Sequence, residues 1–306
     1  MRRPPRPLDP RPRPRVSPAL LRWLDALLEE DRVPHDRTTR RLLPSSEPGQ
    51  AEIVAQANGT LSGAAVAAAL GRRAGVRVKL RRRDGGRVRS GQAVLELSGD
   101  LRRILGAERT MLNLVMHLSG VATLTRRAVA AAGSAHGGPL VMATRKTLPG
   151  LRDLEKQAVV DGGGFPHRRD LAGAVLVKRP HLELVPMAVA LGRARDRGGF
   201  VEVEVTTPGE AVEAARLGAN AVLVDNLAPA EAARVVRALQ RTRLRRRVWV
   251  ELSGGITVRN LPRYRRVGAD AVSLGSLTHS APALPFHLVL RGTRPPPRRV
   301  KRAADL

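Results

Sequence analysis

The second half of the chain alternates short apolar runs with amphipathic stretches. The apolar runs cover residues 140–143, 174–178, 200–205, 221–224, 248–252 and 271–274. Helical patterns lie among them at residues 208–217, 229–239 and 258–267. Repeated β-α units of this size predict a parallel sheet, which closes most economically into a barrel. In such barrels the chemistry lies where strands end and loops begin.

The first half has a different pattern, with glycine-separated strands between helices. Ser17 and Pro18 predict the N-cap and the first residue of a helix. The runs AEIVAQA, VRVKL and AVLELSG predict strands, and a long helix is expected over residues 107–132. Residues 1–16 and 291–306 are rich in Arg and Pro, which predicts two disordered basic tails.

Composition narrows the class of protein. The chain has 306 residues, of which 42% are hydrophobic, so it can bury a globular core. It has no cysteine, which excludes disulfides and thiolate catalysis and agrees with a cytoplasmic protein. No apolar run has the length of a membrane span, and the Arg/Pro-rich N-terminus does not resemble a secretory signal.

The net charge of +27 raises the question of nucleic-acid binding. A basic surface attracts polyanions without specificity. Aromatic residues make up only 2% of the chain, which argues against a surface that stacks single-stranded bases. A nucleic-acid-binding protein that uses its basic tails remains an alternative, but it leaves the motifs below unexplained.

One segment, TRKTLPGLRDLEKQAVVDGGGFPHR, places two cationic pairs around a helix and a glycine run. Arg145 and Lys146 open it, and His167 and Arg168 close it. A helical pattern covers residues 151–160 between them. This arrangement predicts a pocket for a small, strongly anionic molecule.

Charged residues also stand at the ends of the predicted barrel strands. Lys178 ends the second strand, Glu204 lies near the end of the third and Asp225 ends the fourth. In VEVEV the alternation predicts that the valines face the helices and that Glu202 and Glu204 point inward, where a charge needs a partner. Glycine-containing loops that favour phosphate follow the last two strands, with Ser253, Gly254, Gly255, Gly275, Ser276 and His279. Glu204 and Asp225 are oxygen ligands of the kind that Mg²⁺ prefers.

Several motifs in order resemble the quinolinate phosphoribosyltransferases, also called nicotinate-nucleotide pyrophosphorylases. They are EDRVPHDRTTRRLLP, ERTMLNLVMHLSGVATLTRR, the segment above, EVEV, LVDN, ELSGGIT and SLGSLTHSAPAL. The resemblance implies an α/β fold, with an N-terminal α/β sandwich followed by an open, incomplete barrel of seven strands. It places the sandwich at residues 17–120, completed by residues 281–290, and the barrel at residues 121–280. It also implies a head-to-tail homodimer that uses Mg²⁺.

The family resemblance assigns roles to individual residues. Arg145, His167, Arg168 and Lys178 resemble the quinolinate pocket, and Arg109 resembles an arginine lent by the neighbouring subunit. Lys146 resembles a residue at the junction of both substrates, and Glu204 and Asp225 resemble the ribose and metal carboxylates. The two loops from Ser253 and Gly275 resemble the phosphate-binding site. The reaction implied joins quinolinate to phosphoribosyl pyrophosphate and releases pyrophosphate and CO₂, giving nicotinate mononucleotide in NAD biosynthesis.

One motif departs from the family pattern. After Lys178 the family usually has Asp-Asn-His, whereas this chain has Arg179, Pro180 and His181. Arg179 reverses a charge, and Pro180 lacks a backbone donor. A related phosphoribosyltransferase found beside molybdate transport genes departs in the same region, so an enzyme that acts on another aromatic acid is a second alternative.

Overall fold

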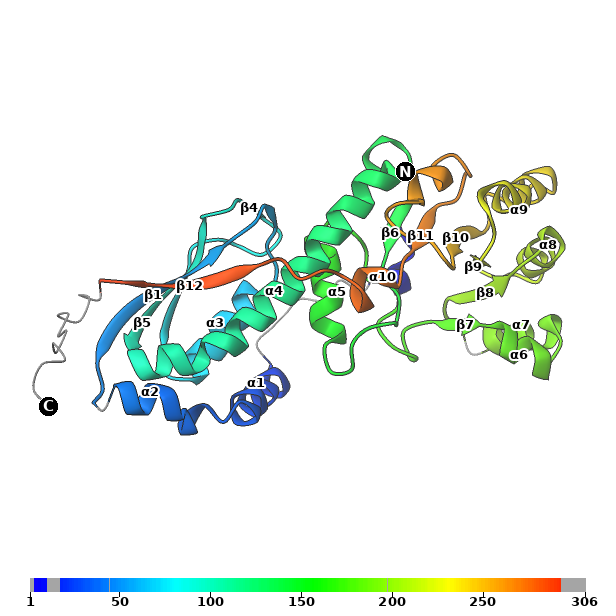
Figure 1. The fold of residues 1–306 in the computed structure, drawn as a ribbon. Coiled ribbons are helices and arrows are strands. Elements are labelled where there is room, and N and C mark those ends of the chain that lie inside the picture. Colours follow the sequence, from blue (N-terminus) through cyan, green and yellow to red (C-terminus); the bar gives the residue numbers. More distant parts are fainter. Residues whose placement is uncertain (1–2, 10–16, 44, 197, 293–306) are drawn as a thin grey trace, which may run out of the picture.

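The computed structural model describes residues 3–9, 17–43, 45–196 and 198–292, which form two lobes joined by one long helix (Figure 1). The first lobe contains helices α1 (Pro18–Glu30), α2 (Arg37–Leu42) and α3 (Ala64–Arg73) and the start of α4 (Leu101–Ala132). Its strands are β1 (Pro48–Ala55), β2 (Gly59–Thr60), β3 (Arg77–Leu80), β4 (Arg87–Val88) and β5 (Ala93–Asp100). Helix α4 runs from this lobe to the second, so the domain boundary expected at residue 120 falls inside a continuous helix.

The first lobe is built on a four-stranded antiparallel sheet in the order β12-β1-β5-β3. Strand β12 (Phe286–Arg291) comes from the far end of the described chain and pairs with β1 from Gln50↔Arg291 to Ala55↔Phe286. Helices α3 and α4 pack together beside the sheet. The sheet is therefore completed only by the segment that follows the second lobe.

The second lobe is an open α/β barrel. Its strands are β6 (Leu140–Met142), β7 (Val175–Val177), β8 (Val201–Val205), β9 (Ala221–Asp225), β10 (Trp249–Ser253) and β11 (Ala271–Ser273). Its helices are α5 (Arg152–Asp161), α6 (Arg179–Leu184), α7 (Met187–Asp196), α8 (Pro208–Arg216), α9 (Pro229–Arg241) and α10 (Ser276–His279). The sheet order is β6-β11-β10-β9-β8-β7, and each pairing in it is parallel.

The strand count differs from the seven that the family resemblance implied. The described barrel sheet holds six strands. Beyond β6, Phe165 makes a single parallel bridge with Met142. Its N–H donates to the Val141 carbonyl at 2.9 Å, and its carbonyl accepts from Ala143 N–H at 2.8 Å. Pro166 follows directly and has no N–H to extend the ladder, so the seventh position is reduced to one residue.

The sequence predicted a disordered tail over residues 1–16, but residues 3–9 are placed against the barrel. Arg6–Leu8 form a 3₁₀ turn. Leu8 is fully buried in an apolar cluster with residues inside the barrel, namely Leu140, Met142, Ala221, Trp249 and Ala271. Four of these are the first residues of β6, β9, β10 and β11. Leu8 therefore closes the end of the barrel opposite the strands' carboxyl ends. The C-terminal tail expected at residues 291–306 lies largely outside the described residues.

Most predicted elements agree with the structure, including the helix that begins after Ser17. The Ser17 hydroxyl accepts from Leu20 N–H at 3.1 Å, as an N-cap should. The helix predicted over residues 258–267 is wrong, because only a 3₁₀ turn, Leu261–Tyr264, forms there. Asn260 bonds Thr257 N–H at 2.8 Å and the Gly255 carbonyl at 2.9 Å, and these local bonds replace those of a helix.

Candidate active site

Strand β8 supplies two inward carboxylates, as its alternation predicted. Val201, Val203 and Val205 are fully buried in the main core. Glu202 is 1% exposed, and Glu204, nearer the strand's carboxyl end, is partly exposed. The strand therefore carries one glutamate deep in the barrel and one near its mouth.

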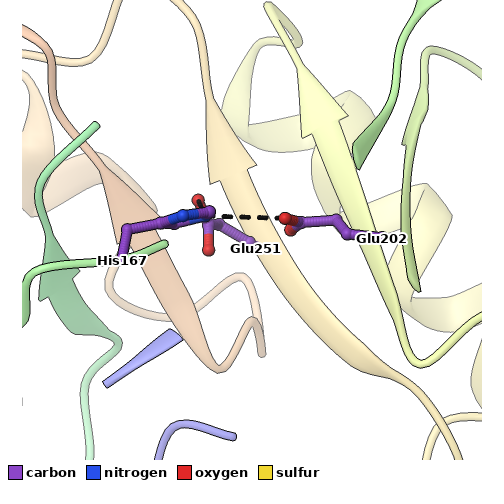
Figure 2. Close-up of side chains that lie close together, drawn as sticks. All are labelled: His167, Glu202 and Glu251. Atoms are coloured by element: carbon purple, nitrogen blue, oxygen red, sulfur yellow. Dashed lines mark ion pairs between the residues drawn. The ribbon is translucent and has the colours of Figure 1, made fainter. Parts of the chain in front are cut away.

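Glu202 has a buried partner. His167 lies between two carboxylates, with Nε2 3.5 Å from Glu202 Oε2 and 3.3 Å from Glu251 Oε1 (Figure 2). All three side chains are almost completely buried. Sequence reasoning assigned His167 to the anion pocket. In the structure its ring is buried in the barrel beside two interior carboxylates, which need a cationic or donor partner.

The charges of this cluster alter the pKa values of His167 and Glu202. Burial lowers the pKa of His167, but Glu251 and Glu202 outweigh burial and raise the pKa to about 10. Burial and the charge of Glu251 raise the pKa of Glu202. The backbone N–H of Arg168 donates to His167 Nδ1 at 2.7 Å. The proton of the neutral ring therefore belongs on Nε2, where it faces both carboxylates.

The same cluster has the spacing of a metal site. The ligand atoms of His167, Glu202 and Glu251 lie within 4.8 Å of one another. A histidine that binds a metal through Nε2 normally donates a proton from Nδ1. Here Nδ1 accepts a hydrogen bond, so Nε2 keeps its proton and is blocked as a ligand. The donor pattern favours an ion-paired cluster over a metal centre.

Arg145 and Arg168 form the cationic side of the mouth. Arg168 is 6% exposed and donates from Nη1 to the Ala174 carbonyl at 2.9 Å. Burial and the nearby charge of Arg145 lower the pKa of Arg168. The Nε of Arg145 is buried, and no described residue accepts from it. Two adjacent guanidinium groups with unused donors suit a small anion with more than one carboxylate.

Lys156, on α5, lies beside these arginines and was not among the predicted site residues. It is 1% exposed, and its Nζ donates to the Pro166 carbonyl. Burial and the charges of Arg152, Arg145 and Arg168 lower its pKa to about 7, although Asp153 opposes them. Its position in LEKQAV resembled a solvated charge, and only the fold shows that this helix face is buried.

Lys146 lies with the last loop. It is exposed, and its carbonyl accepts from Thr278 Oγ1 at 2.7 Å. A Cβ at Gly275 would lie 2.8 Å from Lys146 Cδ and 3.1 Å from His279 Nε2. Glycine at position 275 is therefore needed for these two side chains to approach the same backbone. The predicted residues Lys146, Gly275, Ser276 and His279 thus lie together.

Asp225 and the first phosphate loop are neighbours in the sheet. Ser253 pairs with Asp225, and Asn226 N–H donates to the Ser253 carbonyl at 2.9 Å. Gly254 has φ +82°, and a Cβ there would lie 2.6 Å from Asn226 N. Gly254 is therefore required by both its backbone angle and its crowding. Because residues 258–267 do not form a helix, no helix N-terminus lies behind Gly255 in this loop.

The unusual Arg179 turns away from the mouth. Lys178 is exposed at the end of β7 and is the N-cap of α6. His181 Nδ1 accepts from Lys178 N–H at 2.9 Å. Arg179 donates to Thr206 Oγ1 at 2.6 Å and to Glu210 Oε1 at 3.2 Å. The reversed charge is thus paired with the start of α8, and Pro180 sits in the first turn of α6, where a missing N–H costs little.

Arg109 lies apart from the other predicted residues. It is on α4, its side chain is 62% exposed, and its nearest described carboxylate is Glu108 at 3.8 Å. It lines a cavity with Trp23, Asn113, His117, Pro149 and Leu151. Within the described residues, Arg109 makes no hydrogen bond or ion pair with the residues around Arg145.

Sequence reasoning did not single out two further buried carboxylates, although the alternation of apolar residues could have identified one of them. Glu251 in WVELS alternates with apolar neighbours as Glu202 does in VEVEV, so the same period-two argument could have placed it inside. Glu155 is fully buried and binds His117 Nε2 at 2.8 Å. No local pattern distinguishes Glu155 from an exposed glutamate at the start of a helix.

Comparison with known proteins identifies the family. Residues 36–119 match the model described as quinolinate phosphoribosyl transferase, N-terminal domain, and residues 121–289 match the corresponding C-terminal domain. A probable nicotinate-nucleotide pyrophosphorylase [carboxylating] of Methanothermobacter thermautotrophicus is 40% identical over 263 residues, covering 85% of this chain and 94% of the relative. The human nicotinate-nucleotide pyrophosphorylase [carboxylating] is 37% identical, covering 81% of this chain and 84% of that one.

Solved structures agree. NadC from Streptococcus pyogenes is 32% identical with a TM-score of 0.83, covering 92% of this chain and 100% of that one. The nicotinate-nucleotide pyrophosphorylase from Francisella tularensis is 30% identical with a TM-score of 0.83, covering 90% and 98%. Within the described residues, no helix is both long and apolar enough to cross a bilayer.

Proposed function

This chain belongs to the quinolinate phosphoribosyltransferase family, and on that premise we propose that it transfers phosphoribosyl from phosphoribosyl pyrophosphate to quinolinate. The products are nicotinate mononucleotide, CO₂ and pyrophosphate. The observation that carries this proposal is that Arg145 lies near Arg168 at the barrel mouth. The buried Nε of Arg145 has no partner there among the described residues. A dicarboxylate supplies the acceptors that these donors lack.

Binding and orientation come first in the proposed mechanism. Arg145, Arg168 and Lys178 hold the two carboxylates of quinolinate, so that its ring nitrogen points at the ribose carbon. Lys146 lies against Gly275 and His279, between the two substrates. The loops at Ser253–Gly255 and Gly275–Ser276, with His279, hold phosphate oxygens of the donor. His167 supports Arg168 rather than touching substrate.

Bond changes follow. The bond from ribose C1 to pyrophosphate oxygen breaks, and positive charge builds on the ribose ring. Glu204 and Asp225 lie near the strand ends with carboxylates that stabilise this charge. The quinolinate nitrogen forms the new bond to C1. The adjacent C–C bond to carboxylate then breaks, because the positive ring nitrogen stabilises the carbanion, which takes a proton from solvent.

The donor set also fits Mg²⁺, since Glu204 and Asp225 offer only oxygen ligands at partly exposed strand ends. We infer that these two carboxylates hold the ion. When bound, Mg²⁺ neutralises charge on the departing pyrophosphate.

The homodimer is a proposal of the same kind. Arg109 is 62% exposed on α4 and, among the described residues, makes no hydrogen bond or ion pair with the other predicted site residues, as suits an arginine that acts in the partner's site. Mixing an inactive Arg109→Ala variant with an inactive Lys146→Ala variant should restore activity if sites are shared between subunits. No recovery in the mixed, subunit-exchanged sample would contradict the shared site. Cytoplasmic location likewise stays a prediction.

The direct test is turnover. The protein is incubated with quinolinate, phosphoribosyl pyrophosphate and Mg²⁺, and CO₂ and nicotinate mononucleotide are measured. Equimolar production of both supports the proposal. Nicotinate, which lacks the second carboxylate, is the control substrate. Turnover of nicotinate or another aromatic acid without CO₂ release from quinolinate would favour the related branch instead.

A further inference from the structure

We propose that Glu202 and Glu251 are positioning residues, which hold Arg168 in place for the anionic substrate by clamping the ring of His167 inside the barrel. This inference rests on the proposed function, in which Arg168 binds a carboxylate. It assigns a role to two interior carboxylates that do not themselves reach the mouth. The cluster links β8, β10 and the segment that follows α5.

The first step is the backbone of His167, which has φ +55°. A residue other than glycine adopts this left-handed region at a cost of about 1 kcal/mol or more, so the surrounding structure must stabilise it. Contacts at both ring nitrogens hold His167 in this conformation. Nδ1 accepts from the next N–H at 2.7 Å, and Nε2 faces the two carboxylates at 3.3 and 3.5 Å (Figure 2).

The second step is the covalent neighbour. The N–H that donates to His167 Nδ1 belongs to Arg168. The ring therefore fixes the peptide from which the Arg168 side chain departs. That side chain then runs buried to its bond with the Ala174 carbonyl at 2.9 Å. If the imidazole rotated, its hydrogen bond to the Arg168 N–H would break, and the backbone and guanidinium of Arg168 would be free to move.

The third step is charge. Arg145 lies close enough to Arg168 to disfavour its charged form, and Glu202 opposes that effect. The carboxylate of Glu202 thus offsets part of the repulsion between Arg145 and Arg168 before any anion arrives. Neighbouring Pro166 is held independently, because its carbonyl accepts from buried Lys156. The loop is anchored at three successive residues, and only the Glu202–Glu251 anchor carries negative charge.

The test compares Glu251→Leu with Glu251→Gln, which keeps an oxygen to face Nε2. We expect Glu251→Leu to raise KM for quinolinate about tenfold, with KM for phosphoribosyl pyrophosphate changed less than about twofold. Glu251→Gln should recover most of the loss. Glu96→Gln, on β5 of the other lobe, is the matched control and should behave as the unmodified protein. Thermal melting of each variant shows whether it is folded.

A second measurement does not depend on turnover. Nitrogen-15 spectra of labelled histidine, assigned with His167→Gln, report which ring nitrogen carries the proton. At a pH above the pKa of about 10, where the ring is neutral, we expect an unprotonated Nδ1 and a protonated Nε2. If the unmodified protein fails to convert quinolinate, the proposed function fails, and these spectra still report the clamp.

Three results would overturn the inference. One is a protonated Nδ1 with a bare Nε2 in the spectra. Another is an equal rise in both KM values for a folded Glu251→Leu variant, or a fall in kcat alone. The third is a Glu251→Gln variant as impaired as Glu251→Leu, since an oxygen facing Nε2 would then be irrelevant.

Discussion

The carboxylate of Glu155 joins the two lobes by contacting His117. Oε1 lies 2.8 Å from His117 Nε2 on α4, and Oε2 accepts from Leu148 N–H at 3.1 Å in the loop that follows β6. Glu155 is fully buried, so neither oxygen has water as a substitute partner. One side chain of α5 thus fixes the loop of Arg145 and Lys146 against the connecting helix.

This contact predicts a stability cost. Glu155→Ala leaves the imidazole and an amide without their acceptor, and we expect the free energy of unfolding to fall by about 3 kcal/mol. Urea unfolding followed by circular dichroism measures the change. Glu155→Gln keeps one oxygen and should lose less. A Glu155→Ala protein within about 0.5 kcal/mol of the original would show that the contact is energetically idle.

Arg145→Ala should strongly weaken quinolinate binding while leaving the fold intact. The guanidinium has a buried Nε without a partner among the described residues, so its removal leaves no internal acceptor unsatisfied. Loss of a charged contact of about 2–3 kcal/mol corresponds to roughly a hundredfold weaker binding. Calorimetric titration with quinolinate checks this. Unchanged affinity would remove Arg145 from the site.

Arg179→Ala tests whether the departure from the family pattern affects the substrate. Its guanidinium is 46% exposed and bonds Thr206 and Glu210 rather than facing the mouth. Because exposed ion pairs contribute little, stability should change by less than about 1 kcal/mol and KM for quinolinate should stay the same. A large rise in that KM would place Arg179 in the site after all.

The pH dependence of stability has two opposing contributions. His167 has a pKa of about 10 in the fold against 6.5 ordinarily, so its contribution is full below pH 6.5 and is lost as pH rises through 10. Glu202 of β8 and Glu251 of β10 face its ring. Lys156 behaves in the opposite way, because its pKa is about 7 in the fold against 10.5 ordinarily. The cost of burying it therefore falls as pH rises from about 7 to 10.5. Arg152, Asp153, Arg145 and Arg168 surround it.

We expect these two contributions to cancel between pH 7 and 10 in the unmodified protein. Lys156→Met removes one of them, so its stability should fall by about 1.4 kcal/mol per pH unit across that range. Urea unfolding at each pH gives the slope for both proteins. A slope in Lys156→Met no steeper than in the unmodified protein would contradict the assignment.

Leu8→Ala should destabilise the barrel although it lies in a segment that the sequence presents as a tail. Leu8 is fully buried in a cluster with five other buried apolar residues, and a leucine truncation of this kind costs about 2 kcal/mol or more. Leu42→Ala is the matched control, because Leu42 is 74% exposed. Equal melting temperatures for the two variants would show that the N-terminal segment does not seat on the barrel.

Sequence reasoning placed the strands well because period and strand ends are local properties. VEVEV showed which side chains of β8 face inward, and Thr144 to Lys146 marked a strand end. The partner of Glu202 was out of reach, since His167 and Glu251 come from segments whose meeting depends on the whole barrel. The Arg/Pro composition of residues 1–16 gave no sign that Leu8 would be buried. A single apolar residue is stabilising there only because of the barrel cluster it packs against. The failed helix at residues 258–267 shows the same limit, because Asn260 satisfied the backbone locally.

The two ends of the described chain complete each other's lobes. Leu8, near the N-terminal end, packs inside the barrel, whose strands are synthesised later. Strand β12, near the C-terminal end, supplies the outer strand beside β1, which is synthesised early. During synthesis the β1 edge of the first lobe therefore stays unpaired until β12 is made. Likewise, Leu8 cannot reach its full cluster until β11 is made. Folding in order from the ribosome leaves the second lobe unfinished until β11 has emerged and the first lobe unfinished until residue 291 has emerged. A chain stopped shortly before that point would carry an open sheet edge, which is a template for aggregation.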